Sequence, residues 1–357
     1  MSTCTYVCRP SRPGAPRLRP APTDDARAGH VDTTPPDGAA PADLPSDGAG
    51  AERRVAVVGL GAMGGAMATT LNRAGWAVTG FDPSPEARAR AADAGVATAD
   101  RLEDVAGTPF VVLSLPSARV VEQTVPVLLE REGTRVVLDT TTSEPATSEA
   151  MAAAARERGA VFVDAPVSGG ASGAATGALS AFVGGTPDDV RAAEPLLAAL
   201  TGGQYAVVGG TGAGNVVKLL NNVLCATNLI AVGEAMDVAA AHGLDLATVA
   251  QAVSGASGGS AVTANALPRW VLSGTFDSGF ALGLMARDVG LALDVAAARG
   301  AKPALLAATH DAWQRALAER GPAADFTEAP ATAATATTAL APADATASST
   351  TSSEDDR

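Results

Sequence analysis

Lysine is one of the rarest residue types in the chain, and Lys218 stands at the start of a long apolar stretch. Lys218 and Lys302 are the only lysines among 25 basic residues. A buried amine can lose its proton and a guanidinium cannot, so a lysine retained here predicts a general acid or base. A surface lysine with a solvated amine is the alternative. Asn221 and Asn222 follow on the same face of the expected helix, which indicates buried polar contacts.

The segment Gly59–Gly64 has the spacing of a phosphate-binding turn. Its sequence GLGAMG follows a short apolar run and opens a helical pattern. In such a turn the first glycine permits the tight bend, the second lets a pyrophosphate approach, and the third lets helix and strand pack closely. We expect a dinucleotide to lie at this helix N-terminus. The residues expected to contact it are Gly59, Gly61, Ala62, Met63 and Gly64.

An acidic residue ends the next strand-like run. Asp82 stands where a carboxylate would accept hydrogen bonds from ribose hydroxyls and repel a 2′-phosphate. This favours NAD, although Arg88 nearby keeps NADP as an alternative. A plain turn residue before Pro83 is the structural alternative for Asp82. An S-adenosylmethionine methyltransferase is the alternative function for these two motifs, because it also combines a glycine-rich loop with an acidic residue.

A glycine-dense loop, Asp164–Gly170, follows another buried strand. Ser168 offers a hydroxyl, while Gly169 and Gly170 expose backbone N–H groups. Such a loop can hold a carboxylate without a charged side chain. The alternative is an ordinary turn, which the Ser-Gly-Gly sequence alone would indicate.

The elements that must position these residues form two regions. In the first, short β-branched runs alternate with helical stretches, which predicts a parallel sheet with helices on both faces. In the second, a long helix over 215–241 precedes further predicted helices and no strands; these helices are expected over 246–253, 261–272, 280–299 and 304–320. The fold class is therefore α/β: a Rossmann-type dinucleotide-binding domain followed by an all-α domain, joined by the long helix. The predicted divisions are a disordered tail over 1–52, the binding domain over 53–214, the helical domain over 215–326 and a disordered tail over 327–357.

The composition excludes several classes of function. A formal charge of −13 gives no general attraction for nucleic acid or an anionic membrane. The 3 cysteines and 3 histidines lack ligand spacing, so no metal site is expected. The N-terminus lacks the apolar segment of a signal peptide, and we expect no stretch to approach the ~20 apolar residues of a membrane span. These features predict a cytoplasmic protein.

Three motifs in order carry a family resemblance. They are Gly59–Gly64, the Asp164–Gly170 loop, and the pattern GxGxxxKxxNN over 212–222. Together they resemble the β-hydroxyacid dehydrogenase family (3-hydroxyisobutyrate dehydrogenase-like or tartronate semialdehyde reductase-like) over residues 53–326. The resemblance implies Lys218 as catalytic acid/base and substrate contacts from Asn221 and Asn222. It also implies that Ser168, Gly169 and Gly170 hold the substrate carboxylate.

Further cofactor residues follow from the resemblance alone. Leu115 and Pro116 match the family's Leu-Pro after a strand, and Thr142 ends a match to its Asp-x-Ser-Thr, near the nicotinamide. Arg287 stands where the family usually has a cofactor-contacting lysine, before Asp288. Arginine keeps the charge and changes reach and geometry. We expect cofactor or substrate handling that is altered but retained.

The resulting hypothesis is an NAD(P)-dependent oxidoreductase. Its substrate would be a small 3-hydroxy acid, similar to 3-hydroxyisobutyrate, or the corresponding semialdehyde. The family resemblance implies a homodimer or homotetramer, and no nucleic-acid or membrane partner is expected. A non-catalytic NAD-binding regulatory protein and an imine reductase-like enzyme are the alternatives, and Lys218 argues against the latter.

Overall fold

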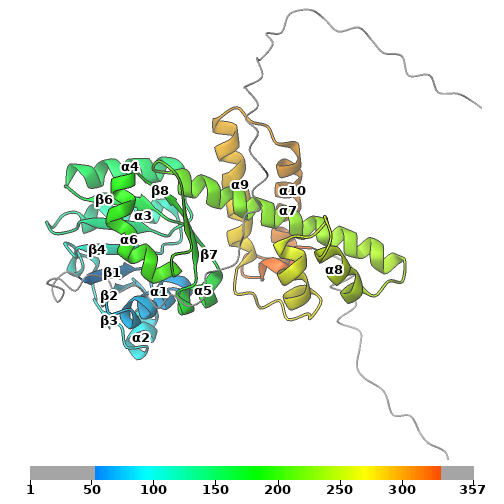
Figure 1. Ribbon diagram of the computed structural model, residues 1–357, viewed down its shortest axis with the longest axis horizontal. Coiled ribbons are helices and arrows are strands. Elements are labelled where there is room, and N and C mark those ends of the chain that lie inside the picture. The colour runs from blue at the N-terminus through cyan, green and yellow to red at the C-terminus, as the bar shows by residue number, and fades with distance from the viewer. Residues whose placement is uncertain (1–52, 331–357) are drawn as a thin grey trace, which may run out of the picture. The chain divides into compact units, whose positions relative to one another are not determined.

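The computed structural model describes residues 53–330; the tail predicted over 1–52 and residues 331–357 of the tail predicted over 327–357 lie outside them. The first region is a sheet with helices packed on both faces (Figure 1). Its nine strands are β1 Arg54–Val58, β2 Ala77–Phe81, β3 Ala97–Thr98, β4 Phe110–Leu113, β5 Val136–Asp139, β6 Val161–Asp164, β7 Val167–Ser168, β8 Ser180–Gly184 and β9 Tyr205–Gly209. Its helices are α1 Ala62–Arg73, α2 Pro85–Asp93, α3 Ala118–Leu128, α4 Pro145–Glu157, α5 Gly170–Thr176 and α6 Pro187–Thr201, with a 3₁₀ turn at Leu102–Asp104.

The strand order is β3-β2-β1-β4-β5-β6-β8-β7, and β9 pairs with β8. The first six strands are parallel and follow the order of a Rossmann dinucleotide-binding sheet. The predicted parallel sheet is confirmed for these strands, whereas the antiparallel pairing of β8 was not predicted. β8 runs antiparallel to both β6 and β7, because the chain turns back through the loop at residues 165–170 and the short α5.

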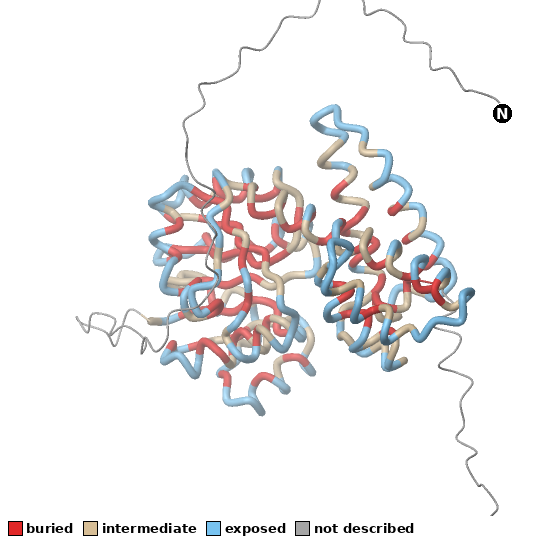
Figure 2. Tube along the Cα trace, turned by 45° about the vertical axis from the view of Figure 1, so that its right-hand side comes forward, coloured by how far each residue is buried: buried red, intermediate tan, exposed pale blue. Residues whose placement is uncertain are grey.

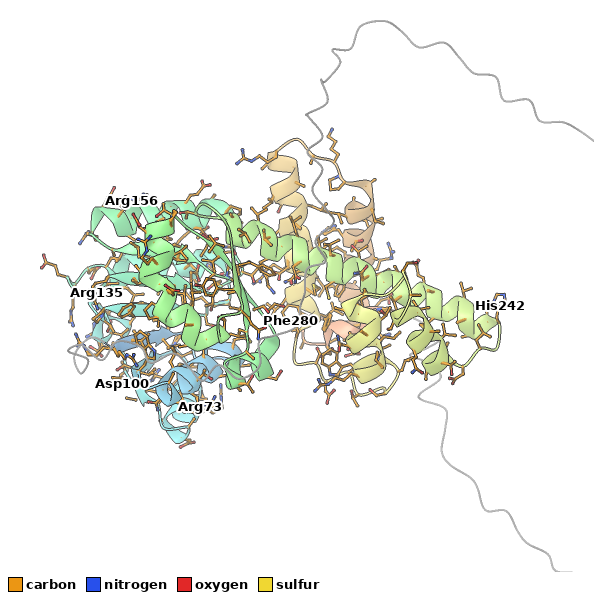
Figure 3. The ribbon with its side chains drawn as sticks, viewed as in Figure 1. Arg73, Asp100, Arg135, Arg156, His242 and Phe280 are labelled. Atoms are coloured by element: carbon orange, nitrogen blue, oxygen red, sulfur yellow. The ribbon has the colours of Figure 1, made fainter. Side chains whose placement is uncertain are left out.

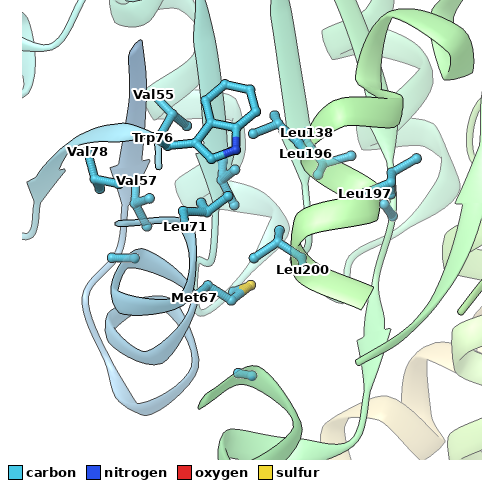
Figure 4. Close-up of a cluster of buried hydrophobic side chains, with 14 of the residues drawn as sticks. Val55, Val57, Met67, Leu71, Trp76, Val78, Leu138, Leu196, Leu197 and Leu200 are labelled. Carbon is cyan, nitrogen blue, oxygen red and sulfur yellow. The ribbon is translucent and has the colours of Figure 1, made fainter. Parts of the chain in front are cut away.

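Both faces of the parallel strands are buried, which is why they contain near-continuous aliphatic residues. Val55 and Val57 of β1 pack on one face against α1 and α6, while Ala56 and Val58 pack on the other against α3 and α4. Figure 4 shows the first of these clusters, in which Trp76 lies among aliphatic side chains from the sheet and the helices. The sheet is thus a rigid support for the loops at its carboxyl edge.

The second region contains helices in the described part of the chain, as expected from the sequence. They are α7 Ala213–Ala241, α8 Leu246–Ser254, a π-helix Val262–Val271, α9 Leu282–Ala298, α10 Ala304–Arg320 and a 3₁₀ turn Phe326–Glu328. α7 packs against β8 near its start and against α9 and α10 farther along (Figure 1). Its buried residues join those of α9 and α10 in one apolar core, visible as the buried inner side of these helices in Figure 2.

In this region the structure differs from three expectations based on the sequence. The helix predicted over 261–272 is a π-helix, and it contains Pro268, which cannot donate an i→i−4 hydrogen bond. The predicted start of the second tail at residue 327 falls inside an ordered element, because Thr327 is buried and caps against Asp325. Finally, α7 has the length and apolar composition of a membrane span, contrary to the expectation that no segment would. A core helix passes the same test, and α7 buries eleven residues.

Candidate active site

The glycine-rich turn lies between β1 and α1, where each glycine has a different steric surrounding. A Cβ added to Gly59 would lie 2.2 Å from the Ser114 carbonyl oxygen, and one added to Gly64 would lie 1.8 Å from the Gly59 oxygen. Around Gly61 nothing lies within 4 Å of such a Cβ. Gly59 and Gly64 are therefore required by the packing of the turn itself. The open space beside Gly61 could accommodate a bound ligand.

Asp82 follows β2 and lies beside this turn. One oxygen of its carboxylate accepts the backbone N–H of Leu60 at 2.8 Å, and the other accepts that of Ser84 at 2.8 Å. Arg88 donates to the backbone carbonyl of Asp82 at 2.7 Å and pairs with exposed Asp100 at 3.6 Å. The position of Asp100 at the rim of this region is labelled in Figure 3. The carboxylate of Asp82, and not the guanidinium of Arg88, thus lies against the glycine-rich turn.

The turn after β4 is held by the segment after β5. The hydroxyl of Thr141 accepts the backbone N–H of Leu115 at 3.0 Å, and the hydroxyl of Thr140 donates to Leu113 at 2.6 Å. Thr141 takes the place of the family's serine and keeps the hydroxyl that this contact needs. Thr142 comes next and is partly exposed. The segment therefore orients the Leu115–Pro116 turn.

The predicted substrate loop is open and has unusual backbone geometry. Ser168 ends β7, and Gly169 and Gly170 both have positive φ, 120° and 62°. Both glycines are exposed, and a Cβ on Gly170 would meet nothing within 4 Å. A residue with a side chain would be strained in this conformation. The loop therefore presents backbone groups rather than side chains.

Lys218 is buried in the second turn of α7, with 9% of its surface exposed. Burial lowers the pKa of its amine, and the nearby groups Asp288 and Cys225 act in the opposite direction. The side chain of Asn222 donates to Asp288 at 2.7 Å, and that of Asn221 donates to Asn222 at 3.1 Å. The two predicted asparagines and Asp288 thus form one hydrogen-bonded group. The charge of Asp288 favours the protonated form of Lys218.

Two buried carboxyl groups support this site from the sheet. Asp164 ends β6, and its two oxygens accept the backbone N–H groups of Gly212 at 2.7 Å and Asn215 at 3.1 Å, at the start of α7. Burial raises the pKa of Asp164 to about 6, although these hydrogen bonds act against the rise. A Cβ on Gly214 would lie 2.7 Å from an Asp164 oxygen. This explains a glycine at that position of the motif, since α7 must approach the carboxyl group closely.

Asp139 stands beside Asp164 on the neighbouring strand β5. One of its oxygens accepts the Thr141 N–H at 2.9 Å, and within residues 53–330 the other has no hydrogen-bond partner. Burial raises the pKa of Asp139 to about 7. Asn215, completely buried, adds contacts to Ser143 at 2.8 Å and Ser148 at 3.0 Å. Asp139, Asn215 and Asp288 were not predicted as site residues, although each is a polar residue within or next to a motif of the sequence.

Two family models match the chain. One, the NAD-binding domain of 6-phosphogluconate dehydrogenase, matches residues 54–210, and one described as NAD-binding of NADP-dependent 3-hydroxyisobutyrate dehydrogenase matches residues 212–332. A probable 3-hydroxyisobutyrate dehydrogenase of Mycobacterium bovis is 36% identical over 255 residues, 69% of this chain and 86% of the relative. An NAD-dependent L-serine dehydrogenase of Pseudomonas aeruginosa is 36% identical over 264 residues, with the same coverage.

The chain belongs to the β-hydroxyacid dehydrogenase family. A solved structure of the 3-hydroxyisobutyrate dehydrogenase of Mycobacterium tuberculosis with L-serine agrees with this membership. It superposes with a TM-score of 0.71 and 33% identity, over 78% of this chain and 98% of that one. The predicted fold class and the predicted enzyme class, an NAD(P)-dependent hydroxyacid oxidoreductase, are confirmed.

The residues of this β-hydroxyacid dehydrogenase fit a dinucleotide cofactor. Gly61 is the N-cap of α1, no side chain caps the first N–H groups of the helix, and the space beside Gly61 is open. Free N–H groups and the positive end of a helix dipole suit a pyrophosphate. Asp82 lies next to the same turn. The individual cofactor and substrate contacts remain predictions.

At position 287 this chain has an arginine where the family usually has a lysine. Its guanidinium donates to Asp288 at 3.0 Å and 2.7 Å, and also to the backbone carbonyl of Pro116. It therefore connects α9 with the turn after β4.

Lys218 has no direct hydrogen bond, within residues 53–330, to the segment Ser168–Gly170. Asp164, which lies just before this segment, connects it to the start of α7.

No group of histidine, cysteine and acidic residues in the described part of this dehydrogenase could hold a metal ion. His242 lies beyond the end of α7, where Figure 3 labels it, with a ring nitrogen 2.8 Å from the Val238 carbonyl. His310 lies on α10 and contacts Gln314 at 3.3 Å. His30 falls outside the described residues.

Proposed function

We propose that this enzyme transfers a hydride between the nicotinamide of NAD(P) and the hydroxyl-bearing carbon of a small 3-hydroxy acid. The substrate would resemble 3-hydroxyisobutyrate or its semialdehyde, and Lys218 would be the general acid/base. The observation that carries the proposal is the burial of Lys218, which lowers the pKa of its amine. A lowered pKa makes the amine easier to deprotonate, as its use as a general base requires.

The nicotinamide, when bound, supplies the redox chemistry by accepting or donating the hydride. In the oxidation direction, Lys218 Nζ takes the proton from the substrate hydroxyl as the hydride leaves the same carbon. In reduction, Lys218 returns a proton to the oxygen. The proton and the hydride together account for the two electrons and two hydrogens exchanged between alcohol and aldehyde.

Substrate orientation would come from two segments. Ser168 and the exposed N–H groups of Gly169 and Gly170 would hold the carboxylate, since positive-φ glycines can present N–H groups to an anion. Asn221 and Asn222 would position the hydroxyl next to Lys218. The bond from Asn222 to buried Asp288 supports a fixed orientation of these amides.

The cofactor contacts would come from Gly59, Gly61, Ala62, Met63, Gly64, Asp82, Leu115, Pro116 and Thr142. The preferred cofactor would be NAD. The carboxylate of Asp82 already accepts two backbone hydrogen bonds beside the glycine-rich turn, which fixes a negative charge there. Arg88 is engaged with backbone carbonyls and Asp100, which leaves it poorly placed to neutralise a 2′-phosphate. The cytoplasmic location also stays a prediction from the sequence.

A substrate screen tests the proposed function. The purified chain would be mixed with 3-hydroxyisobutyrate, L-serine, other short 3-hydroxy acids and 2-hydroxy acids, each with NAD and NADP, and the reduced cofactor followed by absorbance. We expect turnover with 3-hydroxy acids and much less with 2-hydroxy acids. Tight NAD binding with no turnover of any acid would favour the regulatory alternative, and reduction of cyclic imines alone would favour an imine reductase.

We also propose that the chain forms a homodimer or homotetramer. α7 leaves Leu224 59% exposed, with Leu220 and Val238 also exposed, and large apolar side chains on one helix favour burial against a partner copy. Light scattering coupled to size-exclusion chromatography checks this. A mass of 35.2 kDa, that of one chain, at micromolar concentration would contradict it.

A further inference from the structure

Arg287 connects two parts of the site that are far apart in the chain. Its Nη1 donates to the carbonyl of Pro116, 171 positions earlier, while Nε and Nη2 both donate to Oδ1 of Asp288. The side chain of Arg287 is 32% exposed, whereas that of Asp288 is 2% exposed. A buried carboxylate needs a partner charge or several hydrogen bonds, and the guanidinium supplies both.

Asp288 in turn connects to the helix that carries Lys218. It accepts the side-chain N–H of Asn222 at 2.7 Å, and Asn222 lies one helical turn after Lys218 on α7. A continuous chain of contacts therefore runs from the Pro116 carbonyl through Arg287 and Asp288 to Asn222. One end of this chain is the turn predicted to touch the cofactor, and the other is the helix of the predicted acid/base.

We propose that Arg287 is a positioning residue that acts through Asp288. It ties the Leu115–Pro116 turn to α7, and it balances the negative charge that Asp288 presents to Lys218. The inference rests on the proposed function for the role of Lys218, but the contacts themselves do not depend on it.

The planar guanidinium explains why an arginine can serve here. It holds three nitrogens in a rigid fork, so it can donate two hydrogen bonds to one carboxylate oxygen and a third to a carbonyl at the same time. A lysine has a single nitrogen on a flexible stem, so it would supply the charge without the double connection. Arg287→Lys therefore separates the electrostatic part of the proposal from the mechanical part.

The charge around Lys218 makes the electrostatic part measurable. The titratable groups that act on Lys218 through their charge are Asp288 of α9 and Cys225 of α7, and both favour its protonated form. Removing Arg287 would leave the Asp288 charge unbalanced and so raise the pKa of Lys218. Removing the charge of Asp288 would lower it.

The experiment uses the small number of lysines. With only Lys218 and Lys302 in the chain, protein labelled with ¹³C/¹⁵N-lysine gives two lysine side-chain signals, and Lys302 is an exposed internal reference. The pKa of Lys218 is followed by NMR titration, and the Kd for NAD is measured by calorimetry. The variants are Arg287→Met, Arg287→Lys, Asp288→Asn and the double variant Arg287→Met/Asp288→Asn. The control is Arg299→Met, which removes an exposed arginine just beyond the same helix.

We expect Arg287→Met to raise the pKa of Lys218 and to weaken NAD binding about fivefold to tenfold, as loss of a charge-assisted hydrogen bond to an orienting turn would do. Arg287→Lys should leave the pKa of Lys218 near its original value and weaken NAD binding to the same degree. Asp288→Asn should lower that pKa, and the effect of Arg287→Met should shrink in the Asp288→Asn background. Arg299→Met should change neither quantity.

An unchanged or lower pKa of Lys218 in Arg287→Met, or an undiminished effect in the double variant, would overturn the electrostatic part. Unchanged NAD binding in both Arg287 variants would overturn the mechanical part. Neither measurement requires turnover. Absence of activity in the substrate screen would therefore refute the proposed function without affecting this test.

Discussion

The carboxylate of Asp164 accepts a hydrogen bond of 2.7 Å from the backbone N–H of Gly212, 48 positions later in the chain. A second bond, from the N–H of Asn215 at 3.1 Å, uses its other oxygen. One buried acid at the end of β6 thus fixes both the beginning of the predicted substrate loop and the beginning of α7. The position of Lys218 depends on this anchor, since the lysine lies less than two turns farther along the helix.

Replacing Asp164 by Asn should weaken this anchor. An amide offers one acceptor oxygen and places an NH₂ group against one of the two N–H donors, which would cost roughly 1–3 kcal/mol. Urea unfolding measures the loss of stability. We also expect kcat to fall more than NAD affinity, because α7 carries Lys218, the proposed acid/base. Asp188→Asn is the matched control, since that carboxylate is 87% exposed and its ion pair with Arg191 contributes little. Equal stability of the two variants would show that the buried bonds do not support the fold.

Replacing Lys218 should remove catalysis without removing the cofactor. We expect Lys218→Ala and Lys218→Arg to lower kcat by roughly 10²–10⁴-fold, the usual contribution of general acid–base catalysis. NAD affinity, measured by calorimetry, should stay within about threefold of the original, because the glycine-rich turn is untouched. Lys302→Ala removes the other, exposed lysine and should behave like the unmodified enzyme. Near-normal turnover of both Lys218 variants would refute the assignment.

The two motif glycines Gly61 and Gly64 should respond differently to the same substitution. A Cβ at Gly61 meets nothing within 4 Å, so Gly61→Ala should fold normally and lose NAD affinity, since the methyl group takes the space beside the helix N-terminus. At Gly64 a Cβ would lie 1.8 Å from a backbone oxygen, so Gly64→Ala should lower the melting temperature. Calorimetric NAD titration and thermal unfolding of both variants check this. Full NAD affinity in Gly61→Ala would place the pyrophosphate elsewhere.

Asp82→Ala should reduce the preference for NAD over NADP. The substitution removes the negative charge that would face a 2′-phosphate and the acceptor for ribose hydroxyls. It also frees the Leu60 N–H, so NAD affinity should fall. The ratio of kcat/KM for NAD to that for NADP, measured for both proteins, is the test. An unchanged ratio would mean that the adenosine ribose binds away from Asp82.

Asp139 should make the folded state less stable as pH rises. Burial raises its pKa to about 7 in the folded chain from a usual value of 3.8, and it raises that of Asp164 to about 6. Between pH 3.8 and about 7 the folded state binds more protons than the unfolded state, so this contribution to stability is lost as pH rises. Asp139→Asn keeps an acceptor for the Thr141 N–H and cannot ionise.

The unfolding free energy of Asp139→Asn should therefore fall less between pH 5 and pH 8, about the window set by these pKa values, than that of the original chain. Urea titrations at the two pH values measure the difference. If both proteins lose the same stability over this interval, Asp139 does not titrate in the folded state as its burial indicates.

The local patterns were sufficient for the fold class and for the motifs. Short runs of β-branched residues separated by amphipathic helices allow little besides a parallel sheet, and the helix Ala304–Arg320 agrees with its predicted bounds. The antiparallel β7 and β8 and the π-helix were not predicted. Strand direction at a sheet edge depends on how a loop returns, and a π-helix looks like an ordinary apolar helix in sequence.

What the sequence determined by itself was the set of chemical groups: a rare lysine, a glycine spacing and an acid after the second strand. The tertiary structure alone decided which distant groups support them. Asp164 with Gly212, and Asn222 with Asp288, are 48 and 66 positions apart, and no periodicity connects them. The physical reason is that a buried polar group must find its partners wherever the packing brings them, and packing is a property of the whole chain.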